Sequence, residues 1–123
     1  MKATYQTGIK GEEIAEAFLT AQGMRCLHRR YREKNGEIDL IMEEGNTLVF
    51  VEVKTRFSSN ESGIGLIAVT PAKQRRIARC ATFYVMKNDP HGERSIRFDV
   101  VEVNRDGVTH IPNAFQPGGM VFR

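Results

Sequence analysis

The sequence predicts an α/β fold in which a mixed central sheet is flanked by helices. Two runs rich in β-branched and large apolar residues, 36–41 and 48–55, are typical of strands, and a turn signal separates them. An apolar repeat of helical period precedes the two runs, and a second one follows with a further strand after it. The predicted order is helix, three strands, helix, strand.

The first helix is predicted from Gly8 to about Gln22, after a loose lead-in of residues 1–7. Its apolar residues recur at i, i+3, i+4 and i+7, which gives a single apolar stripe. The stripe consists of Ile14, Ala17, Phe18 and Ala21. Gly23 is a typical stop at the carboxyl end of a helix.

Two acids, Glu12 and Glu13, are expected in or near the first turn of this helix. A carboxylate there interacts favourably with the helix dipole. An alternative is that Glu12 reaches a metal site, because Gly8 and Gly11 would allow the helix to approach the sheet closely.

Residues 24–31 are predicted to form a first strand, which pairs with the next two in an antiparallel meander. The strand runs into Arg29-Arg30-Tyr31-Arg32. A basic run is usually a solvated face, but an aromatic residue within it also suits a nucleic-acid backbone. Arg30 and Arg32 are therefore candidate nucleic-acid contacts.

Three polar residues interrupt the second and third strands: Asp39, Glu52 and Lys54. Glu52 and Lys54 project from the same face, because side chains alternate along a strand. If Asp39 faces the same way, two carboxylates and an ammonium meet at one place. Two carboxylates repel each other unless a cation lies between them, and a divalent metal with oxygen ligands removes that repulsion.

An acid on one strand followed by Glu-x-Lys on the next resembles the (P)D-(D/E)xK signature of metal-dependent nucleases. The alternative without a functional role is a Glu–Lys pair on a solvated face of the sheet. The third strand argues against it, because Val49, Val51 and Leu48 make this strand apolar on both sides. Such strands are usually central and covered on both faces.

The chain then leaves the sheet at 55–57 and enters a polar, glycine-containing segment, 58–65. Because this segment directly follows Lys54, it is placed to close over a substrate. It also fits an ordinary connection, and composition does not separate the two interpretations.

A second helix is predicted to start with Thr70 as its N-cap and Pro71 as its first residue. Basic residues crowd its first half, where they oppose the helix dipole and lower local stability. They are Lys73, Arg75, Arg76 and Arg79. Bound phosphate would offset that cost, so phosphate binding is favoured over a purely solubilising role.

Residues 88–92 break this helix, and 95–104 alternates as a fourth strand. The helical crossover places this strand parallel to the third. Residues 108–111 are predicted to add a short edge strand. The chain from Pro112 onward is predicted to be a loose tail.

The length of 123 residues predicts one domain with a substantial core, with residues 1–7 and 116–123 as loose termini. A formal net charge of +3 permits nucleic-acid binding without requiring it. We expect no membrane association, because the sequence shows no apolar run long enough to span a bilayer and no signal peptide, and we expect a cytoplasmic location.

The sequence resembles the YraN-type bacterial family, whose members are described as predicted endonucleases similar to archaeal Holliday-junction resolvases. The matching stretches are Gly8-x-x-Gly11-Glu12-x-x-Ala15, Arg30-Tyr31-Arg32, residues 36–41, 49–56, Lys73-x-x-Arg76, 97–101 and 113–115. The run Arg29-Arg30-Tyr31-Arg32 is a departure, since the family more often has Asn before the Tyr. The resemblance implies a restriction-endonuclease-like αβββαβ core.

The resemblance also implies roles for individual residues. Asp39 and Glu52 match the metal-binding acids, Lys54 the catalytic lysine and Glu12 an auxiliary acid of the first helix. With the Val53 carbonyl, these acids are expected to hold Mg²⁺ or Mn²⁺. The candidate nucleic-acid contacts are Arg30, Arg32, Arg56, Lys73, Arg75, Arg76 and Arg79.

The expected function is metal-dependent endonuclease activity on nucleic acid, with structured or branched DNA as the substrate class. The alternatives are a non-catalytic nucleic-acid-binding module of the same fold and a structural partner in a larger DNA-processing assembly. The intact set of acids and lysine argues against the binding module, because a binder does not need two like charges held together. A homodimer is expected only by analogy with two-fold resolvase-like relatives.

Overall fold

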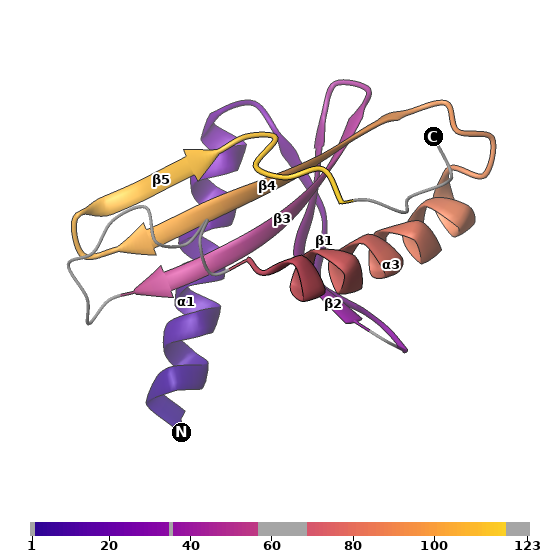
Figure 1. Cartoon of the computed structure of the whole chain (residues 1–123). Coiled ribbons are helices and arrows are strands. Elements are labelled where there is room, and N and C mark those ends of the chain that lie inside the picture. The colour runs from indigo at the N-terminus through magenta and orange to yellow at the C-terminus, as the bar shows by residue number, and fades with distance from the viewer. Residues whose placement is uncertain (1, 35, 57–68, 118–123) are drawn as a thin grey trace.

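The computed structural model of the chain describes residues 2–34, 36–56 and 69–117, which form two helices and five strands (Figure 1). In chain order these are α1 (Lys2–Ala21), β1 (Arg25–Glu33), β2 (Gly36–Glu44), β3 (Thr47–Arg56), α3 (Pro71–Asn88), β4 (Ser95–Asn104) and β5 (Gly107–Ile111). This order confirms the predicted αβββαβ core, to which β5 adds an edge strand.

The strands form a single mixed sheet in the order β1-β2-β3-β4-β5. β1, β2 and β3 are antiparallel neighbours, β3 and β4 run parallel, and β5 pairs antiparallel with β4. The predicted meander, parallel fourth strand and edge strand are all confirmed. A parallel pair needs a long crossover, and α3 lies within it.

Each face of the sheet carries its own hydrophobic core, with α1 behind the sheet and α3 in front of it in Figure 1. On the α3 side, Leu48 and Phe50 pack with Tyr84 and its neighbours on the helix. On the α1 side, Val49 packs with Leu19 and other buried residues of that helix. The prediction that the third strand is central and covered on both faces is confirmed.

Helix α1 is longer than the sequence predicted, because it begins at Lys2 rather than at Gly8. A glycine inside a helix costs only about 1 kcal/mol, so Gly8 does not stop helix propagation. The lead-in prediction is therefore wrong for residues 2–7. The first turn contains no acidic residue, so the dipole interpretation of Glu12 and Glu13 is wrong as well.

Close approach of α1 to the sheet is confirmed at Gly11. A β-carbon at that position would lie 1.9 Å from the Thr55 hydroxyl oxygen, so only glycine fits. Gly36 has a similar role on the other side of the sheet, where a β-carbon would lie 3.0 Å from the Arg76 carbonyl oxygen. These two contacts set the spacing between both helices and the strands that carry the acidic residues.

Helix α3 begins as the sequence predicts. Thr70 is its N-cap, and the Thr70 hydroxyl accepts a hydrogen bond of 3.2 Å from the Lys73 backbone N–H. The cap orients the first turn of α3, and with it the Lys73 side chain. The segment 58–65, predicted to close over a substrate or to connect elements, lies outside the described residues.

The tail predicted to be loose from Pro112 is packed for at least part of its length. Phe115 is only 8% exposed, and its ring stacks on Phe98 with centroids 5.4 Å apart. The Ala114 backbone N–H also donates to the Phe98 carbonyl. The prediction missed this packing because proline and glycine near Phe115 dominate the local pattern. Residues 118–123 lie outside the described residues.

A fully buried acid on β4, Asp99, holds the β4–β5 end of the sheet together. Its carboxylate accepts two hydrogen bonds from the Arg97 guanidinium, at 2.9 and 3.0 Å. It also lies 2.8 Å from His110 Nε2 and accepts from the Asn113 backbone N–H at 2.9 Å. One carboxylate therefore ties together β4, β5 and the segment after β5.

We expect Asp99→Ala to lower the free energy of unfolding by roughly 3 kcal/mol or more, because it leaves Arg97 without its buried partner. Urea unfolding followed by circular dichroism measures the change. Asp106→Ala is the matched control: this exposed acid lies in the β4–β5 turn, and its loss should change stability by less than about 0.5 kcal/mol. Equal stability of the two variants would contradict a structural role for the Asp99 carboxylate.

Candidate active site

The candidate site lies where two neighbouring strands separate. β2 and β3 pair from Glu44 opposite Thr47 as far as Leu40 opposite Val51. Beyond that point β2 continues to pair with β1, and β3 with β4. The resulting fork in the sheet carries Asp39 on one strand and Glu52 on the other.

The regular alternation of side chains breaks at Asp39. Ile38 packs in the core on the α3 side, whereas Leu40, two residues later, packs on the α1 side. The break has a counterpart on β1, where Arg30 lies between the partners of Ile38 and Leu40 and has a φ of 51°. Positive φ is uncommon for a residue other than glycine, and it often accompanies functional sites.

Asp39 bridges the fork through a backbone contact. Its Oδ2 accepts a hydrogen bond of 2.8 Å from the Val53 N–H. Burial raises the pKa of Asp39 well above its ordinary value, and the nearby charge of Glu52 raises it further. The two carboxylates therefore meet at the fork, as the sequence predicted.

Glu52 is buried and is held by two lysines from different elements. Lys54 Nζ lies 3.2 Å from its carboxylate, and Lys73, in the first turn of α3, forms a second ion pair with it. Burial and the adjacent Lys73 lower the pKa of Lys54. Burial opposes a rise in the pKa of Lys73, but the contact with Glu52 outweighs it, and the pKa is raised.

Glu12 approaches the same region from α1. Arg30 Nε donates to its carboxylate at 2.9 Å, and burial raises the pKa of Glu12 despite that contact. The charge of Glu12 in turn raises the pKa of Asp39. Glu12, Arg30 and Leu40 share a cavity of about 170 Å³, so this acid has open space beside it.

Among the described residues, no three acidic, histidine or cysteine side chains converge closely enough to hold one metal ion. The sequence-predicted ligands are placed as two carboxylates, Asp39 and Glu52, with the Val53 backbone between them in reach of Asp39. Glu12 stands farther out, bound to Arg30.

The predicted nucleic-acid contacts fall into two groups. Four of them are engaged with acids in the described part of the chain: Arg30 with Glu12, Arg32 with Glu37, Arg56 with Glu102 and Lys73 with Glu52. The other three, Arg75, Arg76 and Arg79, are exposed on α3, and no ion pair with a described residue involves them. This second group is available to an anionic ligand.

Glu102 is an acid near the site that sequence reasoning missed. It is fully buried on β4, stands opposite Lys54 in the β3–β4 register, and lies 3.7 Å from Arg56 Nε. A signal was available, since a glutamate follows Phe98 and Val100 on the apolar face of the fourth strand. Glu102 therefore places a further carboxyl group beside β3, the strand that carries Lys54.

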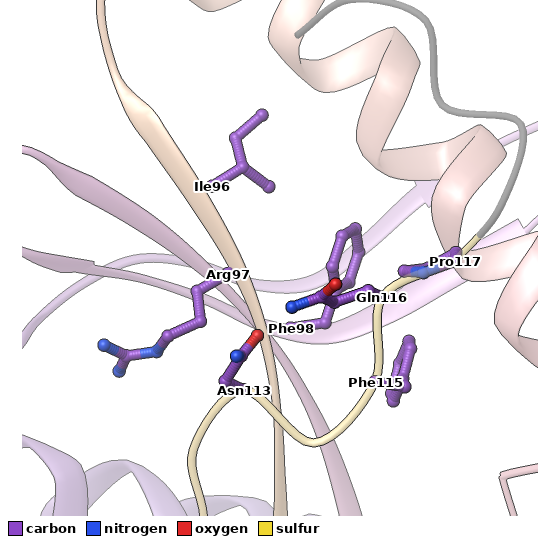
Figure 2. A pocket seen from close by; sticks show the side chains of 7 residues that line it. All are labelled: Ile96, Arg97, Phe98, Asn113, Phe115, Gln116 and Pro117. Carbon is purple, nitrogen blue, oxygen red and sulfur yellow. The ribbon is translucent and has the colours of Figure 1, made fainter.

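A separate cavity of about 300 Å³ lies between β4 and the segment after β5 (Figure 2). Its lining includes Phe98 and Phe115, with Arg97 and Asn113 at its polar side. None of Asp39, Glu52 or Glu12 borders it. The acidic fork and this apolar cavity are therefore distinct features of the molecule.

The sequence from residue 11 to residue 103 matches the family described as "Uncharacterised protein family UPF0102". The match includes every acid and lysine of the fork. The chain belongs to the UPF0102 family. The YraN-type resemblance is thereby confirmed at the level of the family.

UPF0102 proteins from several bacteria resemble the chain over most of its length. The protein of Pelobacter propionicus is 43% identical over 117 residues, which cover 89% of this chain and 82% of the relative. That of Symbiobacterium thermophilum is 49% identical over 100 residues, covering 80% and 81% of the two chains. That of Chlorobium phaeobacteroides is 42% identical over 121 residues, covering 90% and 94%.

A solved structure, that of Pyrococcus furiosus SfsA in complex with Ca²⁺, shows a weak likeness to this UPF0102 chain. The identity is 17%, the match covers 89% of this chain and 62% of SfsA, and the TM-score is 0.38. A similarity of that size supports no conclusion about fold or ligand. In the described part of the chain, neither helix has the length and apolar character needed to span a membrane.

We expect Asp39→Asn to raise the melting temperature in EDTA by about 3–5 °C, which corresponds to roughly 1 kcal/mol of relieved like-charge repulsion. The asparagine oxygen still accepts from the Val53 N–H, and its amide can donate to Glu52. Differential scanning calorimetry measures the shift. Asp106→Asn serves as the control, and an equal or lower melting temperature for Asp39→Asn would show that the two carboxylates do not destabilise the fold.

Proposed function

We propose that this chain is a Mg²⁺- or Mn²⁺-dependent endonuclease that hydrolyses nucleic-acid phosphodiesters, with structured or branched DNA as its substrate class. The observation that carries the proposal is the meeting of Asp39 and Glu52 at the fork, with Lys54 beside Glu52. This placement supports the nuclease-like motif that the sequence contains.

The chemistry of the donors fits a hard divalent cation. Asp39 and Glu52 offer carboxylate oxygens, and the Val53 carbonyl belongs to the same stretch of backbone. Mg²⁺ prefers oxygen ligands and keeps several waters, so a site with few protein ligands suits it. Burial raises the pKa of Asp39 and the charge of Glu52 raises it further, so a cation bound at the fork would favour the ionised form of Asp39.

In the proposed reaction, water attacks phosphorus and gives up a proton to solvent, one P–O bond of the phosphodiester breaks, and the departing oxygen takes a proton from solvent. Bound metal supplies positive charge beside the phosphate. The Lys54 ammonium orients the water or stabilises negative charge as it develops on the phosphate. Glu12 supports the ligand shell from α1, and Arg30 holds Glu12 in place.

The second candidate is a nucleic-acid-binding module without catalysis. The ion pairs that Glu52 forms with Lys54 and Lys73 favour this candidate, since two ammonium groups already balance that carboxylate. It is also favoured by the exposed arginines of α3, which suit binding whether or not cleavage occurs. Cleavage assays on purified protein with linear, flapped and four-way labelled DNA, in Mg²⁺, Mn²⁺ and EDTA, distinguish the two functions.

Metal binding to the native state should raise the melting temperature by mass action. We expect Mn²⁺ to raise the melting temperature of the parent protein but not that of Asp39→Asn. Lys73→Met should increase the Mn²⁺-dependent rise, because it removes a cation that competes for Glu52.

Lys87→Met is the control for the last variant, since this lysine lies at the far end of the same helix and is exposed. Thermal melts over a Mn²⁺ titration give the melting temperatures of the parent protein and of the three variants. If Asp39→Asn and the parent respond equally, the metal binds elsewhere.

Lys54→Ala should lower the cleavage rate about a hundredfold or more, the usual effect of losing one positioned electrostatic group. Affinity for uncleaved DNA in Ca²⁺ should change much less, because the ammonium acts mainly as the transition state forms. Single-turnover cleavage and fluorescence anisotropy provide the two measurements. Arg105→Ala, at an exposed position in the β4–β5 turn, should match the parent in both, and full-rate cleavage by Lys54→Ala would place catalysis outside this site.

A further inference from the structure

The outward face of α3 combines positive charge with exposed apolar side chains. Phe83 is 45% exposed and Met86 is 62% exposed, and they are the exposed large hydrophobic residues within 9–34, 36–56 and 69–117. Both belong to the helix that carries the three exposed arginines. Single exposed apolar residues are ordinary, but neighbouring ones can mark a binding surface, and Phe83 and Met86 lie three residues apart on one helix.

These residues form one continuous stripe. Arg76, Arg79, Phe83 and Met86 follow one another at intervals of three, four and three residues, which is the spacing of a single α-helical face. Arg75 lies beside them, four residues before Arg79. The opposite face of α3 is buried against the sheet through residues that include Ile77 and Tyr84.

The stripe begins close to the acidic fork. Lys73, which contacts Glu52, lies in the first turn of α3, and Phe83 follows ten residues later. At 1.5 Å per residue this places Phe83 about 15 Å along the helix from the fork. That length corresponds to about four nucleotides of a stacked strand, at about 3.4 Å each.

We infer that the stripe on α3 binds an unpaired strand of nucleic acid, with phosphates on the arginines and a base stacked on Phe83. An aromatic side chain among basic residues is the usual way to bind single strands, because every base has a face that can stack. In a duplex those faces are already stacked on neighbouring bases, so a rigid helix surface cannot reach them.

Charge favours this ligand over a second copy of the chain. A two-fold contact through the stripe would enclose the arginines of both copies in one interface to which the stripe contributes no acid, since such interfaces use the same patch twice. Like charges held together in this way are costly. A polyanion, in contrast, gains from each arginine.

The inference rests on the proposed nucleic-acid ligand and narrows its class: the substrate has an unpaired stretch beside the bond that is cut. It does not depend on turnover. The nuclease could be inactive and the stripe could still bind single strands, and the reverse also holds.

The test compares a labelled strand of about twelve nucleotides, within the usual site size, with the same strand annealed to its complement, in EDTA. Phe83→Ala should weaken binding of the single strand roughly 5- to 150-fold, the range for removing one stacked base, and leave duplex binding nearly unchanged. Phe83→Trp should retain affinity, because it retains stacking. Phe83→Leu should not, because it keeps apolar area without an aromatic face.

Arg79→Ala should lower the slope of log affinity against log salt by about 0.7 for each phosphate that the protein no longer neutralises. Arg105→Ala is the matched control, since this exposed arginine lies in the β4–β5 turn away from α3. Thermal melts confirm that each variant is folded, as expected for changes at exposed positions.

Four results would overturn the inference. Unchanged single-strand affinity in Phe83→Ala would exclude stacking on this residue. Full affinity in Phe83→Leu would show that the contact does not need an aromatic face. Equal binding of polyglutamate would indicate an acidic protein as the partner. A parent dimer that becomes monomeric in Phe83→Ala would indicate a second copy. Loss of the nuclease reaction alone, with the Phe83 effect intact, would instead remove the proposed catalysis and leave the inference standing.

Discussion

The structure depends on how it accommodates two carboxylates at one fork of its sheet. Asp39 and Glu52 meet where β2 and β3 stop pairing, and three groups contact them there: the Val53 N–H, Lys54 and Lys73. Lys73 comes from α3, and α1 adds Glu12, which Arg30 holds. The close approach of α1 at Gly11, and of α3 at Gly36, brings the helices near enough to supply them.

A comparison of two acids in the same sheet indicates which charge is structural. Asp99 is fully buried and meets four donors from Arg97, His110 and Asn113, so its charge is matched within the fold. Asp39 meets a single backbone donor among the described residues and faces a second carboxylate. A carboxylate that the protein leaves this poorly matched is a candidate for binding a cation from outside.

The sequence predicted the parts of the fold that local chemistry controls. The apolar runs of β2 and β3 and the Thr70 cap of α3 come from residues close in the chain, and each was correct. The break in alternation at Asp39 was not predictable, because it depends on the conformation of Arg30 in a neighbouring strand. The packing of Phe115 on Phe98 likewise depends on residues distant in sequence. The candidate site residues were proposed from the sequence, whereas the ion pairs that Glu52 forms with Lys73 and Glu12 forms with Arg30 required the structure.

Lys73 lies between the proposed metal site and the proposed nucleic-acid surface. In the structure its ammonium neutralises Glu52, yet it belongs to the helix whose outer face carries the arginines. Under the proposed function, a divalent cation at Glu52 would displace Lys73, and the freed ammonium could then contact a phosphate beside the fork. Each ligand would thereby favour the other, and because coupling between two binding sites is reciprocal, nucleic acid would raise the affinity for metal by the factor by which metal raises the affinity for nucleic acid. The ion pair that competes with metal for Glu52 thus provides a physical route by which the fork would respond to its substrate.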